Sequence, residues 1–530
     1  MRYRVLIAAI FCLLTAYGAS AAKLFIPMDA NGQTNHLKAY GIAFAAMQQG
    51  IKVDWLLNYK GGSFGMEDNK DIEQLCTQRG VSFKKMSDKE YARIVKTVNS
   101  PSFNGQIVQL EKAPKIAVYT PPNKEPWDDA VTMALTYAEI PFDKIYADEV
   151  LAGGLDKYDW LHLHHEDFTG QYGKFWSSFH DAPWYINDQK TMEDLAAKHG
   201  YKKVSQLQLA VVKKIRDFVA SGGNMFAMCS ATETFDIALA ADGVDICASP
   251  YDGDPIDPDA QKKLDFNNCF AFKDFTICDN PYEYKHSSID NTSTRNIPEN
   301  LDYFKIVSPP GKMDAVPLML CQNHTNTISG FMGQTTAFRK EVIKPNVMIL
   351  GDRTQAASVG TGTSKNYVIM QDYEARYIHG EYGQGSWTFL GGHDPEDYRH
   401  MVGSAPTDLS MFPNSPGYRL ILNNVLFPAV KKNVVPTVVM NPAQKDEAAT
   451  TAAKAQPGSI KLYPNPANDE LVISISTGNI EQVAILNIAG QELIRQAYNT
   501  GQVSVAMKDL QPGLYMVKVN GEYVGKVVKE

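Results

Sequence analysis

The sequence predicts an α/β protein built on a parallel sheet, followed by a small all-β sandwich at the C-terminus. Three observations lead to this fold class. Short apolar runs alternate with amphipathic helical patterns through most of the chain, which is the order of elements in a parallel sheet. Residues 431–459 contain no Phe, Trp or Tyr and are rich in Ala, Thr, Lys and Pro, as linkers are. Residues 460–530 carry short period-two patterns separated by turn residues.

The composition is that of an ordinary globular protein with several domains. The chain has 530 residues, of which 44% are hydrophobic and 21% charged. Its net charge is -8 and no basic block is present. Binding to nucleic acid requires a cationic surface, so we expect no nucleic-acid partner.

The N-terminus has the pattern of an export signal. Arg2 and Arg4 precede an apolar run over residues 5–14, and small residues follow up to Ala22. This order is typical of a signal peptide, which we place at residues 1–22. The run is too short to span a bilayer, and we expect no transmembrane span in the mature chain. Export permits disulfides, and Cys269 and Cys278 are the pair that we consider for a bridge.

An N-terminal α/β segment covers residues 23–112. Its patterns predict strands over 24–28, 52–57 and 81–84, with helices over 35–49 and 72–79. Because strands and helices alternate, we expect these strands to be parallel. The glycines at 61 and 62 mark a turn and do not form a phosphate-binding loop.

A second α/β domain covers residues 113–430. Strands are predicted over 115–119, 143–146, 158–163, 224–228 and 386–390, and helices over 128–139, 205–220, 233–241 and 418–426. Residues 250–365 are rich in Asn, Pro and Thr, and we interpret them as an insertion that covers or shapes a site.

The tail, residues 460–530, predicts a β-sandwich. Alternating strands begin at Leu471, Gln482, Gln502 and Leu514, with turn residues between them. Its motifs LYPNPA (462–467), NIAGQE (487–492) and LQPGLY (510–515) resemble the type A sorting domain of the type IX secretion system of Bacteroidota. The resemblance implies that the type IX machinery is a partner and that the protein reaches the cell surface or the medium. An adhesive or sugar-binding β-domain is the alternative.

Cys229 is the candidate nucleophile. It follows the strand 224–228 and precedes a helix, with the small residues Ala227 and Ala231 on either side. A nucleophile on such a sharp turn stands above the sheet, and the helix N-terminus is expected to lower the pKa of the thiol. The alternative is a buried core cysteine.

His393 is the candidate base for this cysteine. It follows a predicted strand, where open α/β sheets place their sites, and Asp394 or Glu396 is expected to orient it. The alternative is that His393 caps a turn and that Asp394 begins a helix.

A second polar cluster follows the strand 158–163. We expect His164, His165, Glu166 and Asp167 to line a substrate pocket beside Cys229. On this interpretation the protein uses no cofactor and no metal. The alternative is a divalent metal held by His162, His164, His165 and His393, with Asp397 and His400 as further ligands, since imidazoles and carboxylates suit zinc or iron.

Residues 118–241 and 380–427 resemble the class I glutamine amidotransferase-like fold, a flavodoxin-like parallel sheet. The segment YGQGSWTFLGGHD (382–394) is similar to the late strand of that group. The family pattern has glycines around the nucleophile and a glutamate two residues after the histidine. Here Ala227 and Ala231 replace the glycines, and Glu396 lies three residues after His393.

Residues 23–428 also resemble exported Bacteroidota proteins labelled asparagine synthetase B. The segments NHLKAYG (35–41), WLHLHHEDFTGQYG (160–173) and GGHDPEDY (391–398) carry this resemblance. An enzyme of that kind requires a cysteine at its mature N-terminus and an ATP-binding domain. The mature chain begins at Ala22 or Lys23, and no phosphate loop is visible.

Three functions follow as hypotheses. The first is an exported cysteine amidase or related hydrolase that uses Cys229 and His393. The second is a metal-dependent hydrolase that uses His164, His165 and His393. The third is a surface binding protein that keeps only the fold.

Overall fold

The computed structural model describes residues 22–121, 129–292, 297, 299–306, 325–352, 374–399, 401 and 404–430 of the larger part of the chain. In the tail it describes residues 460–464, 466–475, 479–487, 492–511, 513–520 and 522–529. Residues 1–21, Cys321, His400 and residues 431–459 lie outside the described residues, and so do the predictions made for them. The chain divides into two compact units, residues 1–438 and 439–530.

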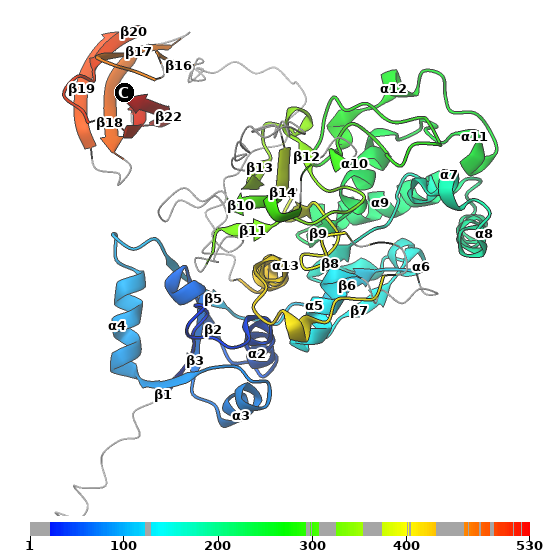
Figure 1. Ribbon diagram of the computed structural model, residues 1–530, viewed down its shortest axis with the longest axis horizontal. Coiled ribbons are helices and arrows are strands. Elements are labelled where there is room, and N and C mark those ends of the chain that lie inside the picture. Colours follow the sequence, from blue (N-terminus) through cyan, green and yellow to red (C-terminus); the bar gives the residue numbers. More distant parts are fainter. Residues whose placement is uncertain are drawn as a thin grey trace, which may run out of the picture. The chain divides into compact units, whose positions relative to one another are not determined.

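The N-terminal sheet is antiparallel throughout, with strand order β4-β1-β3-β2-β5 (Figure 1). Its strands are β1 (Ala22–Ile26), β2 (Val53–Leu57), β3 (Ser63–Glu67), β4 (Lys84–Ser87) and β5 (Gln106–Leu110). The expected parallel arrangement is therefore wrong. The short connection through Gly61 and Gly62, both at positive φ, returns β3 beside β2 as a hairpin, and a parallel crossover needs a much longer connection.

Three helices belong to this segment: α2 (His36–Gln48), α3 (Lys70–Gln78) and α4 (Asp88–Val98). Asn35 caps α2 by accepting a hydrogen bond from the Lys38 amide, and Ser87 forms a capping box with Glu90 at the start of α4. The sequence patterns located α2 and α3 and missed α4, β3 and β5.

The larger sheet is mixed, and the described residues contribute ten strands to it. Its parallel half has the order β7-β6-β8-β9-β15. These strands are β6 (Ile116–Tyr119), β7 (Asp143–Ile145), β8 (Trp160–Leu163), β9 (Asn224–Met228) and β15 (Gly385–Leu390). The chain order reverses between β6 and β8, and a crevice at the carboxyl ends of the strands is expected at such a point.

The other half of this sheet is antiparallel and comes mostly from the insertion. It contains β10 (Tyr303–Ile306), β11 (Thr327–Ser329), β12 (Phe338–Arg339), β13 (Met348–Asp352) and β14 (Glu374–Tyr382). β14 pairs with β15 and joins the two halves. The insertion thus extends the sheet in addition to covering it.

Helices accompany the parallel strands. They are α5 (Ala130–Ala138), α6 (Ala147–Leu151), α7 (Trp176–Phe179), α8 (Pro183–Lys198), α9 (Val204–Ala220), α10 (Ala231–Ala240), α11 (Ser249–Asp252), α12 (Ala260–Lys263) and α13 (Pro416–Leu426). α2, α5 and α13 pack on one another, so the N-terminal segment shares a core with residues 113–430.

Side chains of β9 alternate between two hydrophobic cores. Phe226 and Met228 belong to the core shared with α2, α5 and α13, whereas Met225 and Ala227 belong to the core that contains α9 and α10. The sheet is therefore covered on both faces, and polar side chains of the parallel half gather where the strands end.

The C-terminal unit consists of two antiparallel sheets around one core. One sheet contains β16 (Ile460–Tyr463), β17 (Glu470–Ile475) and β20 (Gln502–Ala506). The other contains β18 (Ile480–Asn487), β19 (Glu492–Thr500), β21 (Gly513–Val519) and β22 (Glu522–Lys529). Leu471 and Val503 of one sheet share a core with Ile485 and Val517 of the other.

Among the described residues, each helix is too short or too polar to span a lipid bilayer. Cys269 and Cys278 are free thiols, so the bridge considered for them is not formed. Cys269 is buried, and its thiol donates a hydrogen bond to the Asp236 carbonyl oxygen. It therefore packs in the core as a small apolar side chain.

Candidate functional site

Cys229 occupies the sharp turn between β9 and α10. Its φ is 53°, a left-handed conformation that residues other than glycine rarely adopt. Ala227 and Ala231 are fully buried beside it, which explains the small residues at these positions. The local backbone thus has the sharp strand–turn–helix geometry on which nucleophile elbows are built.

The surroundings of the Cys229 thiol contradict the expected low pKa. Burial raises the pKa of this thiol, and the backbone N–H groups of Gln334, Ser230 and Thr335 offset the increase only in part. The amide of Gln334 donates to the sulfur at 3.3 Å. Among the described residues the thiol has no hydrogen bond to a histidine, so the expected pair with His393 is not formed.

His393 contacts another histidine. Its Nδ1 lies 2.9 Å from Nε2 of His164, and the two ring centroids are 4.4 Å apart. The Asp394 carboxylate instead accepts from the Tyr418 hydroxyl at 2.8 Å and from the Glu396 amide at 2.9 Å. In a catalytic pair, an orienting carboxylate would accept a hydrogen bond from Nδ1 of His393. Here Nδ1 faces His164 instead.

Three histidines converge at the ends of β8 and β15. One nitrogen from each of His164, His165 and His393 lies within 4.8 Å of the others. His164 and His393 are buried, and His165 is the member that is not. The two strands are separated by β9 alone, so their carboxyl ends bring distant residues into one cluster.

Asp129, which the sequence analysis did not single out, supports this cluster. Its carboxylate caps α5 through the amides of Val131 and Thr132. It also lies 3.0 Å from Nε2 of His162 and 3.6 Å from Nδ1 of His164. The sequence signal that could have identified Asp129 is its position as an acidic residue at the start of the helix that follows β6.

The charges of this group follow from burial and proximity. Burial alone would raise the pKa of the Asp129 carboxyl, but His162 and His164 hold it well below its ordinary value. Burial lowers the pKa of His164 well below 6.5, and the attraction of Asp129 opposes this shift only in part. Asp129 is thus ionised beside the neutral imidazole of His164, the form of histidine that binds metals.

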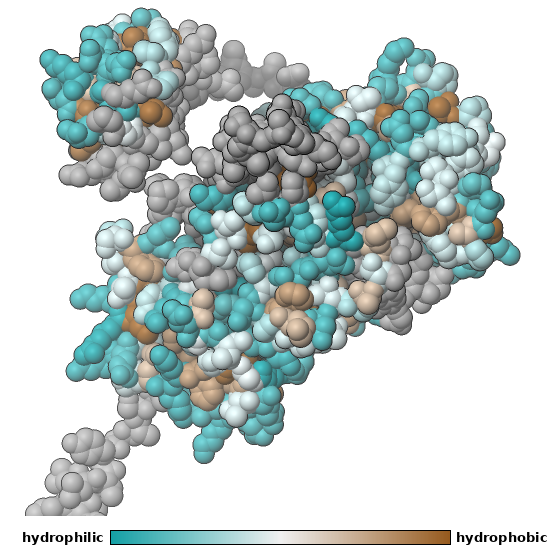
Figure 2. Space-filling model, in the orientation of Figure 1, coloured by the Kyte–Doolittle hydropathy of each residue, from teal (hydrophilic) through white to brown (hydrophobic). Residues whose placement is uncertain are grey.

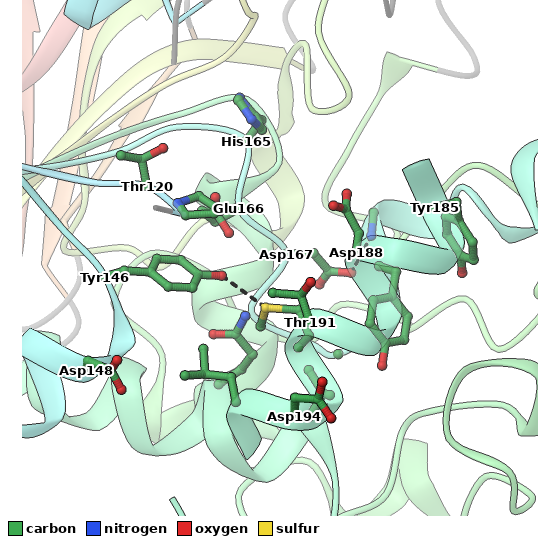
Figure 3. Close-up of a pocket in the computed structure, with 18 of the residues that line it drawn as sticks. Thr120, Tyr146, Asp148, His165, Glu166, Asp167, Tyr185, Asp188, Thr191 and Asp194 are labelled. Atoms are coloured by element: carbon green, nitrogen blue, oxygen red, sulfur yellow. Dashed lines mark hydrogen bonds between the residues drawn. The ribbon is translucent and has the colours of Figure 1, made fainter. Parts of the chain in front are cut away.

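A cavity of about 480 Å³ opens beside the cluster. His165, Glu166 and Asp167 line it, whereas His164, for which we expected the same position, is not among its lining residues. Cys229, His393, Asp394 and Glu396 do not line it either. Figure 3 shows His165 and Glu166 on one side of the view and Asp148 and Asp194 on the opposite side.

A second buried polar network lies near Cys229. The Glu233 carboxylate accepts from the hydroxyls of Ser287 at 2.7 Å and Thr335 at 2.9 Å. Burial raises the pKa of Glu233, and burial together with Glu233 raises the pKa of Asp290 to about 7. Three of these residues, Ser287, Asp290 and Thr335, lie in the insertion, where the sequence offered no pattern to identify them.

Comparison with known proteins identifies the C-terminal unit. Residues 461–530 match the family model of the secretion system C-terminal sorting domain. The chain carries a type IX sorting domain. The protein is therefore exported through the type IX secretion system to the cell surface or the medium.

The other two comparisons give no match that identifies the rest of the chain. No curated protein shows a significant sequence match. Cytoplasmic protein STM3548 from Salmonella typhimurium is 10% identical, covering 60% of this chain and 100% of its own, with a TM-score of 0.29. Cytoplasmic protein STM1381 from Salmonella typhimurium LT2 is 13% identical, covering 60% of this chain and 100% of its own, with a TM-score of 0.30. A beta-galactosidase from Bacillus circulans sp. alkalophilus is 11% identical over 86% of this chain and 44% of its own, with a TM-score of 0.24. Scores this low do not establish a shared fold.

Proposed function

We propose that the protein is an exported metal-dependent hydrolase in which His164, His165 and His393 bind one divalent ion. The observation that carries the proposal is the approach of three imidazole nitrogens to within 4.8 Å of one another. Ligands of a tetrahedral zinc ion, each about 2.0–2.1 Å from the metal, are separated by about 3.3 Å. The 2.9 Å between His164 and His393 is close to this spacing.

The number of ligands favours a catalytic site over a structural one. Structural zinc sites use four protein ligands, whereas catalytic sites use three and leave a position for water or substrate. His165 lines the cavity and is the least buried of the three histidines. The open position of the ion would therefore face the cavity.

Asp129 supplies the outer partner that a metal-bound histidine usually has. Histidine ligands commonly direct their second ring nitrogen at a carboxylate, which fixes the ring and makes it a stronger ligand. Nδ1 of His164 faces the Asp129 carboxylate at 3.6 Å while Nε2 faces the cluster. An ion would also balance the charge of this buried carboxylate.

The chemistry of such a site is hydrolysis. A divalent ion lowers the pKa of its bound water and polarises a carbonyl or phosphoryl oxygen. Glu166 follows His165 and lines the same cavity, and we assign it as the base that takes the proton from the water.

We also propose that residues 113–430 have a glutamine amidotransferase-like, flavodoxin-like core. Counted along the chain, the parallel strands stand in the order second, first, third, fourth, fifth, which is the flavodoxin-like order. The elbow at Cys229 is also consistent with this fold. The label asparagine synthetase B adds no chemistry to the proposal, because no ATP loop accompanies it.

A cysteine amidase is the second candidate, and one observation favours it. The strained backbone of Cys229 at φ 53° is a feature that clusters at active sites. Cys229→Ser would abolish turnover in a cysteine amidase and leave it unchanged in the metal-dependent hydrolase.

The metal content of the mature protein tests the proposal. We expect about one zinc, iron or manganese ion per chain by mass spectrometry, and its loss in His164→Ala and His393→Ala. His180→Ala, which removes an exposed histidine directly after α7, is the matched control and should retain the metal. Circular dichroism confirms that each variant is folded. Wild-type protein that binds no divalent ion in a titration would overturn the proposal.

A further inference from the structure

The cavity beside His165 has the size and position of a small-molecule site. It measures about 480 Å³, within the range of ligand pockets. Thr120 follows β6, Tyr146 follows β7 and His165 follows β8, so the cavity lies where the strand order reverses. Residues of α6, α8 and α9 and of the segment 166–175 form the remaining wall.

Two buried polar atoms at the cavity have no hydrogen-bond partner within the part of the chain that the structure describes. They are the hydroxyl of Tyr185 on α8 and Oε1 of Gln208 on α9. Each residue is 2% exposed. An unsatisfied buried polar group destabilises the folded protein, so these atoms are positions at which groups of a ligand can bind. Oε1 only accepts hydrogen bonds, and a ligand that occupies this place must donate them.

The lining charges are mostly negative. The carboxylates are Asp148, Glu149, Glu166, Asp167, Asp188 and Asp194, and the cations are Lys144 and Lys198. Lys198 is paired with Asp148 at 2.6 Å. A cleft lined by one sign of charge attracts ligands of the other sign.

Aromatic rings form the apolar part of the wall. Trp184 packs edge-on against Phe175 and Tyr185, with centroids 5.8 Å apart in both pairs. Trp184 is 38% exposed, and Ile186 and Tyr284 beside this cluster are also exposed. Figure 2 shows pale and brown residues gathered over α7 and α8 at the right of the view. Aromatic faces attract organic cations as well as apolar stems.

We propose that this cavity binds an organic cation, a primary ammonium or a guanidinium on an apolar stem. The cationic group donates hydrogen bonds to Gln208, Tyr185 and the acidic side chains, and the stem packs against Trp184. That this ligand is the substrate rests on the hydrolase proposed above, which places the bond to be cleaved beside His165.

Calorimetric titration of the mature, chelator-treated protein with agmatine tests the binding site. We expect binding that weakens as salt is added, because the attraction is between charges. Tyr185→Phe and Asp188→Asn should each weaken it at least tenfold. Asp217→Asn, an exposed carboxylate on α9 outside the cavity, should leave it unchanged.

The outcomes separate this inference from the metal proposal, since binding is measured without metal. Failure to bind agmatine, or binding that Tyr185→Phe and Asp188→Asn leave intact, overturns the cation site even if the metal is present. Binding of a neutral sugar such as maltose in place of agmatine also overturns it and identifies a glycan pocket. Agmatine binding in a protein that never binds a metal supports the cation site and overturns only its role in hydrolysis.

Discussion

His164 Nε2 lies 2.9 Å from His393 Nδ1, although 229 residues separate the two in the chain. The contact exists because β8 and β15 flank β9, and their carboxyl ends meet at one edge of the sheet. The sequence analysis paired His393 with Cys229 as a base. The structure places His393 beside a second histidine instead, an arrangement that supports the proposed metal site over nucleophilic catalysis by Cys229.

The role of Asp129 can be separated from its role as a helix cap. Asn is as good a cap as Asp, so Asp129→Asn keeps the hydrogen bonds to α5 and removes the charge that faces His164. We expect metal affinity to fall about 10–100-fold, as for other outer partners of metal ligands. Competition with a chelating dye measures the affinity.

Asp408→Asn is the matched control, because Asp408 caps a short helix through the Ser410 amide. It should leave the metal affinity at the wild-type value. Equal affinities for Asp129→Asn and wild type would show that Asp129 serves the fold alone.

Alkylation rates report whether Cys229 is a nucleophile. Cys229 is 3% exposed and burial raises the pKa of its thiol, so we expect slow reaction with iodoacetamide at pH 7.5. Cys278 is partly exposed and serves as the internal reference that reacts first. Peptide mass spectrometry follows both.

Cys229→Ala should leave the metal content unchanged. Rapid alkylation of Cys229 well below pH 8.5, slowed by His393→Ala, would contradict this prediction and restore the cysteine amidase.

Sequence patterns located those strands and helices whose apolar periodicity and end signals are visible within the segment itself. The strands 116–119 and 224–228 are apolar runs, and the helix 204–220 has an apolar stripe that ends at two glycines. The direction of β3 could not be read in this way, because it depends on a five-residue connection that closes a hairpin. β14 was missed because Glu374 and Arg376 interrupt its apolar pattern and yet are buried.

The candidate site shows the same division. His165, Glu166 and Asp167 follow a recognisable strand, so their place at a cavity could be expected. Asp129 and Tyr185 could not be linked to them, because only the packing of α5 and α8 brings them near. The local sequence pattern predicts at which strand end a residue lies. Which other side chains meet it at that strand end depends on the packing of distant helices.

Gly41 is required where α2 crosses α5. A Cβ at this position would lie 1.8 Å from the carbonyl oxygen of Ala138. Gly41→Ala should therefore lower the free energy of unfolding by about 1–3 kcal/mol, in spite of the better helix propensity of alanine. Gln48→Ala, at an exposed position of the same helix, is the control for propensity. Denaturant unfolding that is unchanged in Gly41→Ala would show that the two helices separate without cost.

Asp290 gives the stability a defined dependence on pH. Burial and the neighbouring Glu233 raise its pKa from 3.8 to about 7 in the folded protein. Below pH 3.8 the Asp290 carboxyl is protonated in both the folded and the unfolded state. Between pH 3.8 and about 7 the folded state keeps a proton that the unfolded state loses. The contribution of Asp290 to the free energy of unfolding therefore falls as pH rises through this range.

Asp290→Asn removes this penalty, because an amide does not ionise and its oxygen still accepts from the Thr292 and Thr336 amides. From pH 5 to pH 8 we expect the Tm of the variant to rise relative to wild type, by an amount that corresponds to roughly 1–4 kcal/mol. Asp217→Asn, at the surface, should show a constant difference over the same range. A constant difference for Asp290→Asn as well would mean that Asp290 ionises in the folded protein at an ordinary pH, and that the Glu233 network stabilises its charged form.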